Sequence, residues 1–167
     1  TGSLGNTEAG MWIARQFEGL GIAPLNGSYS QSFKATDGSV GRNIVGILPS
    51  AGRSFNRRYM IVAAHYDGFG ELDGAIYPGA DSNASGVAAM LNIGKMISAM
   101  VSYGKTYRQN IIFVALDAKN LSMGGAKALW ESIENREMRN PLTGEAIGKE
   151  DISMMVNIDQ IGSCLSP

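Results

Sequence analysis

Three apolar segments of this sequence end in side chains that could do chemistry. The segment MIVAA is followed by His65 and, two residues later, Asp67. The segment IIFVAL is followed by Asp-Ala-Lys-Asn, and MVNI by Asp159. In open α/β sheets, functional groups gather where the strands end at their carboxyl side. If the three strands are neighbours, one crevice brings together the residues His65, Asp67, Asp117, Lys119, Asn120 and Asp159. A Gly-rich loop that leads into a helix adds Asp81, Ser82 and Asn83.

The spacing of His65 and Asp67 has a physical logic. Side chains alternate along a strand, so these two point to the same side. The Asp67 carboxylate can then accept the second ring N–H of His65 and turn the imidazole toward a metal ion. Taken alone, the pair is more often a histidine with a polar neighbour, so the metal hypothesis depends on the other positions.

Composition limits the classes of function. The 167 residues include one His and one Cys, and the formal net charge is −1. One Cys excludes an intrachain disulfide and a Cys-based zinc site, and one His excludes any site that needs two imidazoles of this chain. The near-zero charge predicts no nucleic-acid partner. The longest apolar runs are far shorter than a bilayer requires, so we expect no membrane span.

The hydrophobic pattern predicts alternating strands and helices. Helices are expected at 6–21, 86–101 and 123–139, and strands at 29–35, 40–48, 57–65, 109–116 and 152–162, with a long Gly-rich loop at 67–86. This order indicates an α/β protein, a three-layer α/β/α sandwich with a mixed, mainly parallel central sheet. No linker divides the chain, so residues 1–167 are expected to form a single domain.

The order of three motifs carries a family resemblance. HYD, PGAD-x-NASG and NID-x-IG follow one another, and similar stretches include WIARQFEGLGIAPL, GRNIVGILPS and NIIFVALDAKN. In these features the chain resembles the zinc-dependent exopeptidases that include aminopeptidase Y-type and leucyl aminopeptidases. Glutaminyl cyclase and the transferrin-receptor ectodomain are relatives without peptidase activity. The resemblance covers nearly the whole chain and implies a zinc exopeptidase-like fold that lacks its C-terminal part.

The resemblance also implies roles for individual residues. Active members hold two zinc ions with a His, a bridging Asp, a Glu, a second Asp and a distal His, and another Glu is the general base. The positions that keep the family's residue are His65 as first ligand, Asp67 as its orienting partner and Asp159 as the second Asp. The positions that differ are Ser82 at the bridge, Lys119 at the base and Asn120 at the ligand Glu. The distal His has no counterpart before Pro167.

These replacements weaken the expected metal site. Zinc in proteins normally has three or four protein ligands, and here His65 and Asp159 remain beside a neutral Ser82. We therefore expect zinc binding to be weak or absent, and loss of the base removes a typical rate contribution of about 10²–10⁴. One hypothesis is that the Lys119 ammonium replaces the missing positive charge by pairing with Asp159, Asp81 or Asp67. The alternative is a lysine that is simply exposed at a strand end.

Two functions follow from this site. The first is a degenerate aminopeptidase-like domain without peptidase activity, a pseudoenzyme that binds a peptide or protein ligand or has a structural role. The alternative is an active metallo-aminopeptidase whose atypical metal site is completed by sequence beyond Pro167. Because relatives are exported, we expect a secreted or periplasmic, extracytoplasmic location. Asp81, Asn83 and Asp117 remain further candidates for lining the crevice. A serine hydrolase built on Ser122 is disfavoured, because the only histidine precedes that serine.

Overall fold

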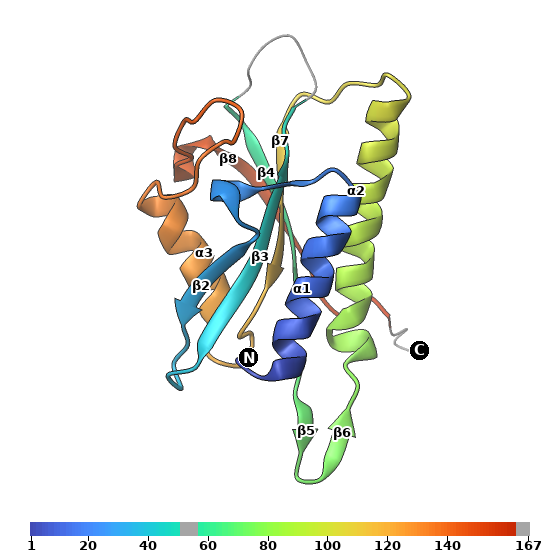
Figure 1. Cartoon of the computed structure of the whole chain (residues 1–167), viewed down its shortest axis with the longest axis vertical. Coiled ribbons are helices and arrows are strands. Elements are labelled where there is room, and N and C mark those ends of the chain that lie inside the picture. The colour runs from blue at the N-terminus through green and yellow to red at the C-terminus, as the bar shows by residue number, and fades with distance from the viewer. Residues whose placement is uncertain (51–56, 163–167) are drawn as a thin grey trace, which may run out of the picture.

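The computed structural model describes residues 1–50 and 57–162 and contains one mixed sheet (Figure 1). The sheet has six strands. Five of them lie in the order β1-β3-β7-β4-β8, and the sixth, β2, pairs with the first half of β3. The strands are β1 (Ala23–Pro24), β2 (Ser30–Lys34), β3 (Val40–Leu48), β4 (Tyr59–His65), β7 (Asn110–Leu116) and β8 (Ile152–Ile158).

Helices cover both faces of this sheet, which confirms the predicted α/β/α layers. In Figure 1, α1 (Leu4–Gly19) and α2 (Gly86–Ser102) lie on one side and α3 (Gly124–Glu134) on the other. Short helical turns occur at η1 (Leu25–Gly27), η2 (Ala80–Ser85) and η3 (Lys149–Asp151), and a hairpin of β5 (Gly70–Leu72) and β6 (Ala75–Tyr77) projects beyond the sheet.

The direction of the strands decides where their polar ends meet. β4 runs parallel to β7 and to β8, whereas β3 is antiparallel to β7 and to both N-terminal strands. β4 and β7 are almost entirely buried, as expected for parallel strands covered on both faces. In the register, His65 lies opposite Leu116, and Ala64 lies opposite Ile158. The three carboxyl ends therefore share one edge of the sheet.

Alternation along the strands builds a separate core on each face. Phe113 of β7 packs with Phe17 of α1 and Met90 of α2, and all three are fully buried. The neighbouring Ile112 points to the opposite face and packs with Leu129 of α3. The period-2 pattern of the buried strands thus places one set of side chains under each helical layer.

The segments around the sheet depart from the sequence-based expectation in two places. The helix expected at 123–139 ends at Glu134, and Arg136 then adopts a left-handed φ of 55°, which a continuing α-helix does not allow. The segment expected as a plain Gly-rich loop contains the β5–β6 hairpin. Its turn residues Asp73 and Gly74 have φ values of 52° and 76°, as a type I′ turn requires.

Within residues 1–50 and 57–162, one helical stretch, Ala80–Ser102, is long and apolar enough by composition to cross a membrane, with a mean hydropathy of 1.4. Uninterrupted apolar runs in this chain are short, which is why no membrane span was expected, but this helical stretch is apolar on average. A single stretch of this kind is weak evidence, since helices that cover a sheet meet the same criterion. Val87 and Met90 of α2 are indeed buried against the sheet in this protein.

Candidate functional site

A cluster of three charged or titratable side chains lies at the carboxyl edge of the sheet. His65 ends β4, Lys119 lies in the turn after β7, and Asp159 follows β8. The Lys119 ammonium donates to Oδ2 of Asp159 at 2.6 Å and lies 3.1 Å from Nε2 of His65. Nε2 of His65 is also 3.2 Å from Oδ1 of Asp159. The structure thus brings these three predicted site residues into mutual contact.

The ion pair changes the acidity of the aspartate. The hydrogen bond from Lys119 holds the pKa of Asp159 below its ordinary value, against the smaller effect of burial, which raises it. About a third of each side chain is exposed, 29% for Lys119 and 32% for Asp159. Among the three carboxylates that Lys119 was expected to meet, its ammonium pairs with Asp159.

His65 is oriented differently from the expectation. Its Nδ1 lies 3.0 Å from the backbone carbonyl oxygen of Asp67, and because a carbonyl can only accept, Nδ1 carries the proton. The Asp67 carboxylate was predicted to fill this role, but its Oδ1 is 3.6 Å away, too far for a hydrogen bond. The other oxygen, Oδ2, accepts the backbone N–H of Lys119 at 3.0 Å and so positions the Lys119 turn.

The protonation of His65 selects its partner on the other ring nitrogen. A neutral ring accepts from Lys119 through Nε2, whereas a charged ring donates to Asp159. Burial lowers the pKa of His65, but its contacts with Asp67 outweigh burial and the nearby Lys119 charge, so this pKa lies above its ordinary value.

Asn83, a predicted crevice residue, holds the backbone together. Its amide donates to the carbonyls of His65 and Ile158 at 3.2 and 2.9 Å, and its Oδ1 accepts from Gly86 and Gln160 at 3.2 and 3.1 Å. The side chain is 3% exposed. All of its hydrogen-bonding capacity is thus used to fasten the ends of β4 and β8 to the start of α2.

Asp117, another predicted crevice residue, anchors α1. Oδ1 accepts from the side chains of Thr1 and Asn6 at 2.9 and 3.2 Å, and Oδ2 accepts the backbone N–H of Arg42 at 3.0 Å. The residue is 1% exposed. These donors come from the segment before α1, from α1 itself and from β3, so the carboxylate ties the first turn of α1 to the sheet.

The remaining candidates do not join the cluster. Oδ1 of Asp81 accepts the N–H of Gly162 at 2.7 Å, and Asn120 is exposed. Ser82, which occupies the family's bridging position, lines a different and larger cavity. A pocket of only about 40 Å³ adjoins His65, Lys119 and Asp159.

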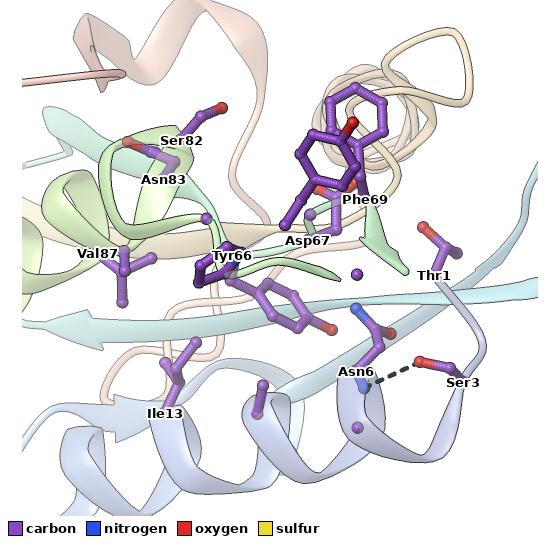
Figure 2. Close-up of a pocket in the computed structure, with 18 of the residues that line it drawn as sticks. Thr1, Ser3, Asn6, Ile13, Tyr66, Asp67, Phe69, Ser82, Asn83 and Val87 are labelled. Carbon is purple, nitrogen blue, oxygen red and sulfur yellow. Dashed lines mark hydrogen bonds between the residues drawn. The ribbon is translucent and has the colours of Figure 1, made fainter. Parts of the chain in front are cut away.

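The larger cavity was not anticipated from the sequence. It has a volume of about 740 Å³ and lies between α1, the β5–β6 hairpin and the start of α2. Figure 2 shows Asn6 and Ile13 of α1 on one side, Asp67 and Phe69 on the other, and Tyr66 between them. The Asp73–Gly74 dipeptide was a usable signal for the hairpin, which brings the Phe69 and Tyr77 rings within 6.1 Å.

The residues at the strand edge do not fit a zinc ion. In residues 1–50 and 57–162 no group of three or more His, Cys, Asp or Glu side chains could hold a metal. The two surviving ligand types, His65 and Asp159, are bridged by the Lys119 ammonium. A primary ammonium is a donor without a lone pair for a metal.

The sheet order, the two helical layers and the clustered strand ends define a zinc exopeptidase-like fold. The pattern of peptidase family M28 matches residues 43–165, and the chain belongs to this family. Among solved structures, glutaminyl cyclase of Porphyromonas gingivalis has a TM-score of 0.68 at 20% identity, over 97% of this chain and 55% of that one. A Zn-dependent exopeptidase of Parabacteroides distasonis has a TM-score of 0.52 at 24% identity, over 70% and 40%. Both similarities concern the fold.

One similar protein of known name is a subunit of a complex. The BOS complex subunit ncln of Danio rerio is 29% identical over 105 residues, which are 62% of this chain and 17% of that protein. The matched region is therefore a small part of a much longer relative. Zinc is named for the exopeptidase neighbour, whereas this relative is named as a subunit of a complex.

Proposed function

We propose that this chain is a non-hydrolytic domain of the M28 family, a degenerate member of its aminopeptidase branch, in which an ion pair takes the place of the metal centre. The observation that carries the proposal is the Lys119 ammonium, placed 2.6 Å from Asp159 and 3.1 Å from Nε2 of His65. With zinc binding weak or absent, the domain acts by binding a peptide or protein ligand or by supporting an assembly. The similarity to a subunit of the BOS complex supports this role.

Electrostatics supports the exclusion of zinc. A divalent cation about 4 Å from an ammonium is repelled by roughly 8 kcal/mol at an effective dielectric constant of about 20. Full structural zinc sites bind with about 10–16 kcal/mol. With His65 and Asp159 as the two remaining ligands, little of that affinity is available to overcome the repulsion. Ser82 adds no charge, because a serine hydroxyl is neutral.

The test compares the natural chain with a variant that carries the family's residues. The triple substitution Ser82→Asp, Lys119→Glu and Asn120→Glu removes the ammonium and adds three carboxylates. Zinc affinity is measured by competition with a chromophoric chelator, and hydrolysis is followed on an aminoacyl substrate with added zinc. A matched control is Lys127→Glu, which makes one of the same charge changes at an exposed position of α3.

The natural chain and the control variant are expected to bind no zinc stoichiometrically and to show no turnover. The triple variant should bind zinc at least tenfold more tightly than either, because the Lys119 repulsion is gone and a carboxylate takes its place beside His65 and Asp159. Stoichiometric zinc together with turnover in the natural chain, or in a longer form that continues beyond Pro167, would overturn the proposal in favour of an active metallo-aminopeptidase.

Family resemblance also supports an extracytoplasmic location, secreted or periplasmic. The test is fractionation of cells that express the natural protein, with detection by antibody. Recovery in the cytosolic fraction alone would contradict this part of the proposal and leave the absence of hydrolysis unaffected.

A further inference from the structure

The large cavity beside α1 has the walls of a small-molecule site. Its volume of about 740 Å³ lies within the usual range of ligand pockets, about 300–1,000 Å³. Aromatic side chains from three separate segments line it, namely Trp12 of α1, Tyr66 after β4, and Phe69 and Tyr77 of the hairpin. Trp12, Phe69 and Tyr77 are each about half exposed or more, so these rings present free faces to a ligand.

The charged side chains that line the cavity are acidic, and Thr1, which carries the α-amino group, also lies on its wall. Asp67 and Glu71 contribute carboxylates, and no Lys, Arg or His contributes to the lining in the part of the chain that the structure describes. A low-dielectric hollow with charges of one sign concentrates ligands of the opposite charge. The two carboxylates therefore favour a cationic ligand over an anionic one.

The polar groups of the wall leave one acceptor without a donor. The hydroxyl of Tyr66 donates to the carbonyl of Arg42 at 2.8 Å, the amide of Asn6 donates to Asp117, and Asn83 is fully used. In contrast, Oδ1 of Asp67 is buried and has no hydrogen-bond partner among the described residues; Nδ1 of His65 lies 3.6 Å from it, beyond hydrogen-bond distance. A buried carboxylate oxygen without a donor is costly, and a bound N–H group would relieve this cost.

We propose that this cavity binds a small organic ammonium compound, a cation with an apolar or aromatic body. The body packs on Trp12, Phe69 and Tyr77, and the ammonium is directed toward Asp67 with Glu71 at the rim. Aromatic faces favour such cations as well, because the negative face of a π system attracts a positive charge. This site adjoins the Lys119 cluster through Asp67, whose Oδ2 accepts the backbone N–H of Lys119, but it requires no metal there.

The experiment uses three probes that share a phenylethyl body and differ in charge: 2-phenylethylammonium, the neutral 2-phenylethanol and the anionic 3-phenylpropionate. Each is titrated into the ¹⁵N-labelled chain at constant ionic strength, and amide shifts locate the site. With about nine non-hydrogen atoms, the ammonium probe is expected to bind with a Kd on the order of 1 mM. The shifts should centre on the start of α1, the hairpin and the start of α2. The neutral probe should bind about tenfold more weakly, and the anion more weakly still.

Variants separate the charge from the aromatic wall. Phe69→Ala, at an exposed position, should weaken the ammonium and the alcohol alike, whereas Glu71→Gln should reduce the preference for the ammonium about twofold. Asp67→Asn should reduce that preference about tenfold. The matched controls, Trp130→Ala and Glu131→Gln on exposed positions of α3, should change neither.

Two results would overturn the proposal. The first is an anion that binds as well as the ammonium, or amide shifts centred elsewhere. The second is the absence of saturable ammonium binding up to about 10 mM. If Asp67→Asn fails to fold, the two exposed variants still test the proposal. It is also refuted if Phe69→Ala leaves the affinity for the ammonium probe unchanged and Glu71→Gln leaves the preference for that probe over the alcohol unchanged. None of these readouts measures zinc or hydrolysis, so the result is independent of the proposed function.

Discussion

The Lys119–Asp159 ion pair should stabilise the fold measurably, and a double-mutant cycle can measure by how much. The perturbations are Lys119→Met, which keeps the length of the side chain without its charge, and Asp159→Asn. Fully exposed ion pairs contribute about 0–1 kcal/mol, whereas hydrogen bonds to charged groups contribute about 1.5–3 kcal/mol. With two thirds of each side chain buried and a 2.6 Å contact, we expect a coupling energy of about 1–2 kcal/mol.

The assay is urea unfolding at pH 7 of the natural chain, both single variants and the double variant. In thermal unfolding, the Tm of each variant should drop by about 2–4 °C for each kcal/mol of unfolding free energy that the variant loses, as for other chains of this size. Arg57 and Glu145 form the internal control, because their 3.4 Å pair is 62% and 47% exposed. A coupling energy for Lys119 and Asp159 no larger than that of this control pair would refute the assignment.

The same pair predicts a pH dependence. Because the folded state holds the pKa of Asp159 below its ordinary value of 3.8, the pair contributes its full stability above that ordinary value. The contribution is lost as the pH falls through the lowered pKa. Below about pH 5, where the neighbouring His65 is already protonated, the coupling energy should therefore shrink as the pH falls below about 4. A coupling that grows as the pH falls would contradict this assignment.

Two further predictions concern the residues that turned out to be structural. Asn83→Ala should lower the free energy of unfolding by about 3 kcal/mol, since it removes both donors to the strand ends. The exposed control Asn92→Ala should cost under about 0.5 kcal/mol. Both are measured by urea unfolding, and equal losses would contradict the role of Asn83 in holding the strand ends. Asp117→Ala should free the first turn of α1 by removing the acceptor for Asn6. The rate of backbone amide hydrogen exchange should therefore rise in that turn and stay unchanged in α2. An unchanged exchange rate in the first turn would show that other contacts hold α1.

Much of the fold could be predicted from local patterns. The apolar runs at 59–65 and 110–116 became the buried strands β4 and β7, because a strand covered on both faces has apolar side chains at every position. The end of α3 and the β5–β6 hairpin were missed. Both depend on residues with positive φ, at Arg136 and at Asp73–Gly74, and such turns leave only a short trace in a sequence.

The candidate site was predictable in composition but less so in contacts. The motifs pointed to His65, Lys119 and Asp159, which do meet at the edge of the sheet. They also pointed to Asn83 and Asp117 as crevice residues, and each lines a pocket, while its polar atoms hold backbone and helix in place. A polar residue at a strand end can turn toward the crevice or toward neighbouring backbone donors, and its position in the sequence does not distinguish the two.

The residue types at the positions of the proposed metal site were determined by the sequence alone. A serine, a lysine and an asparagine stand at positions 82, 119 and 120, and no fold can give them the carboxylates that a two-metal site requires. The tertiary structure decided which partners the remaining groups have. Lys119 and Asp159 are 40 residues apart, and they meet because β4 lies between β7 and β8 in the sheet. The aromatic cavity likewise exists only because α1, the hairpin and α2 converge, since packing between distant segments follows strand order and helix placement rather than local residue patterns.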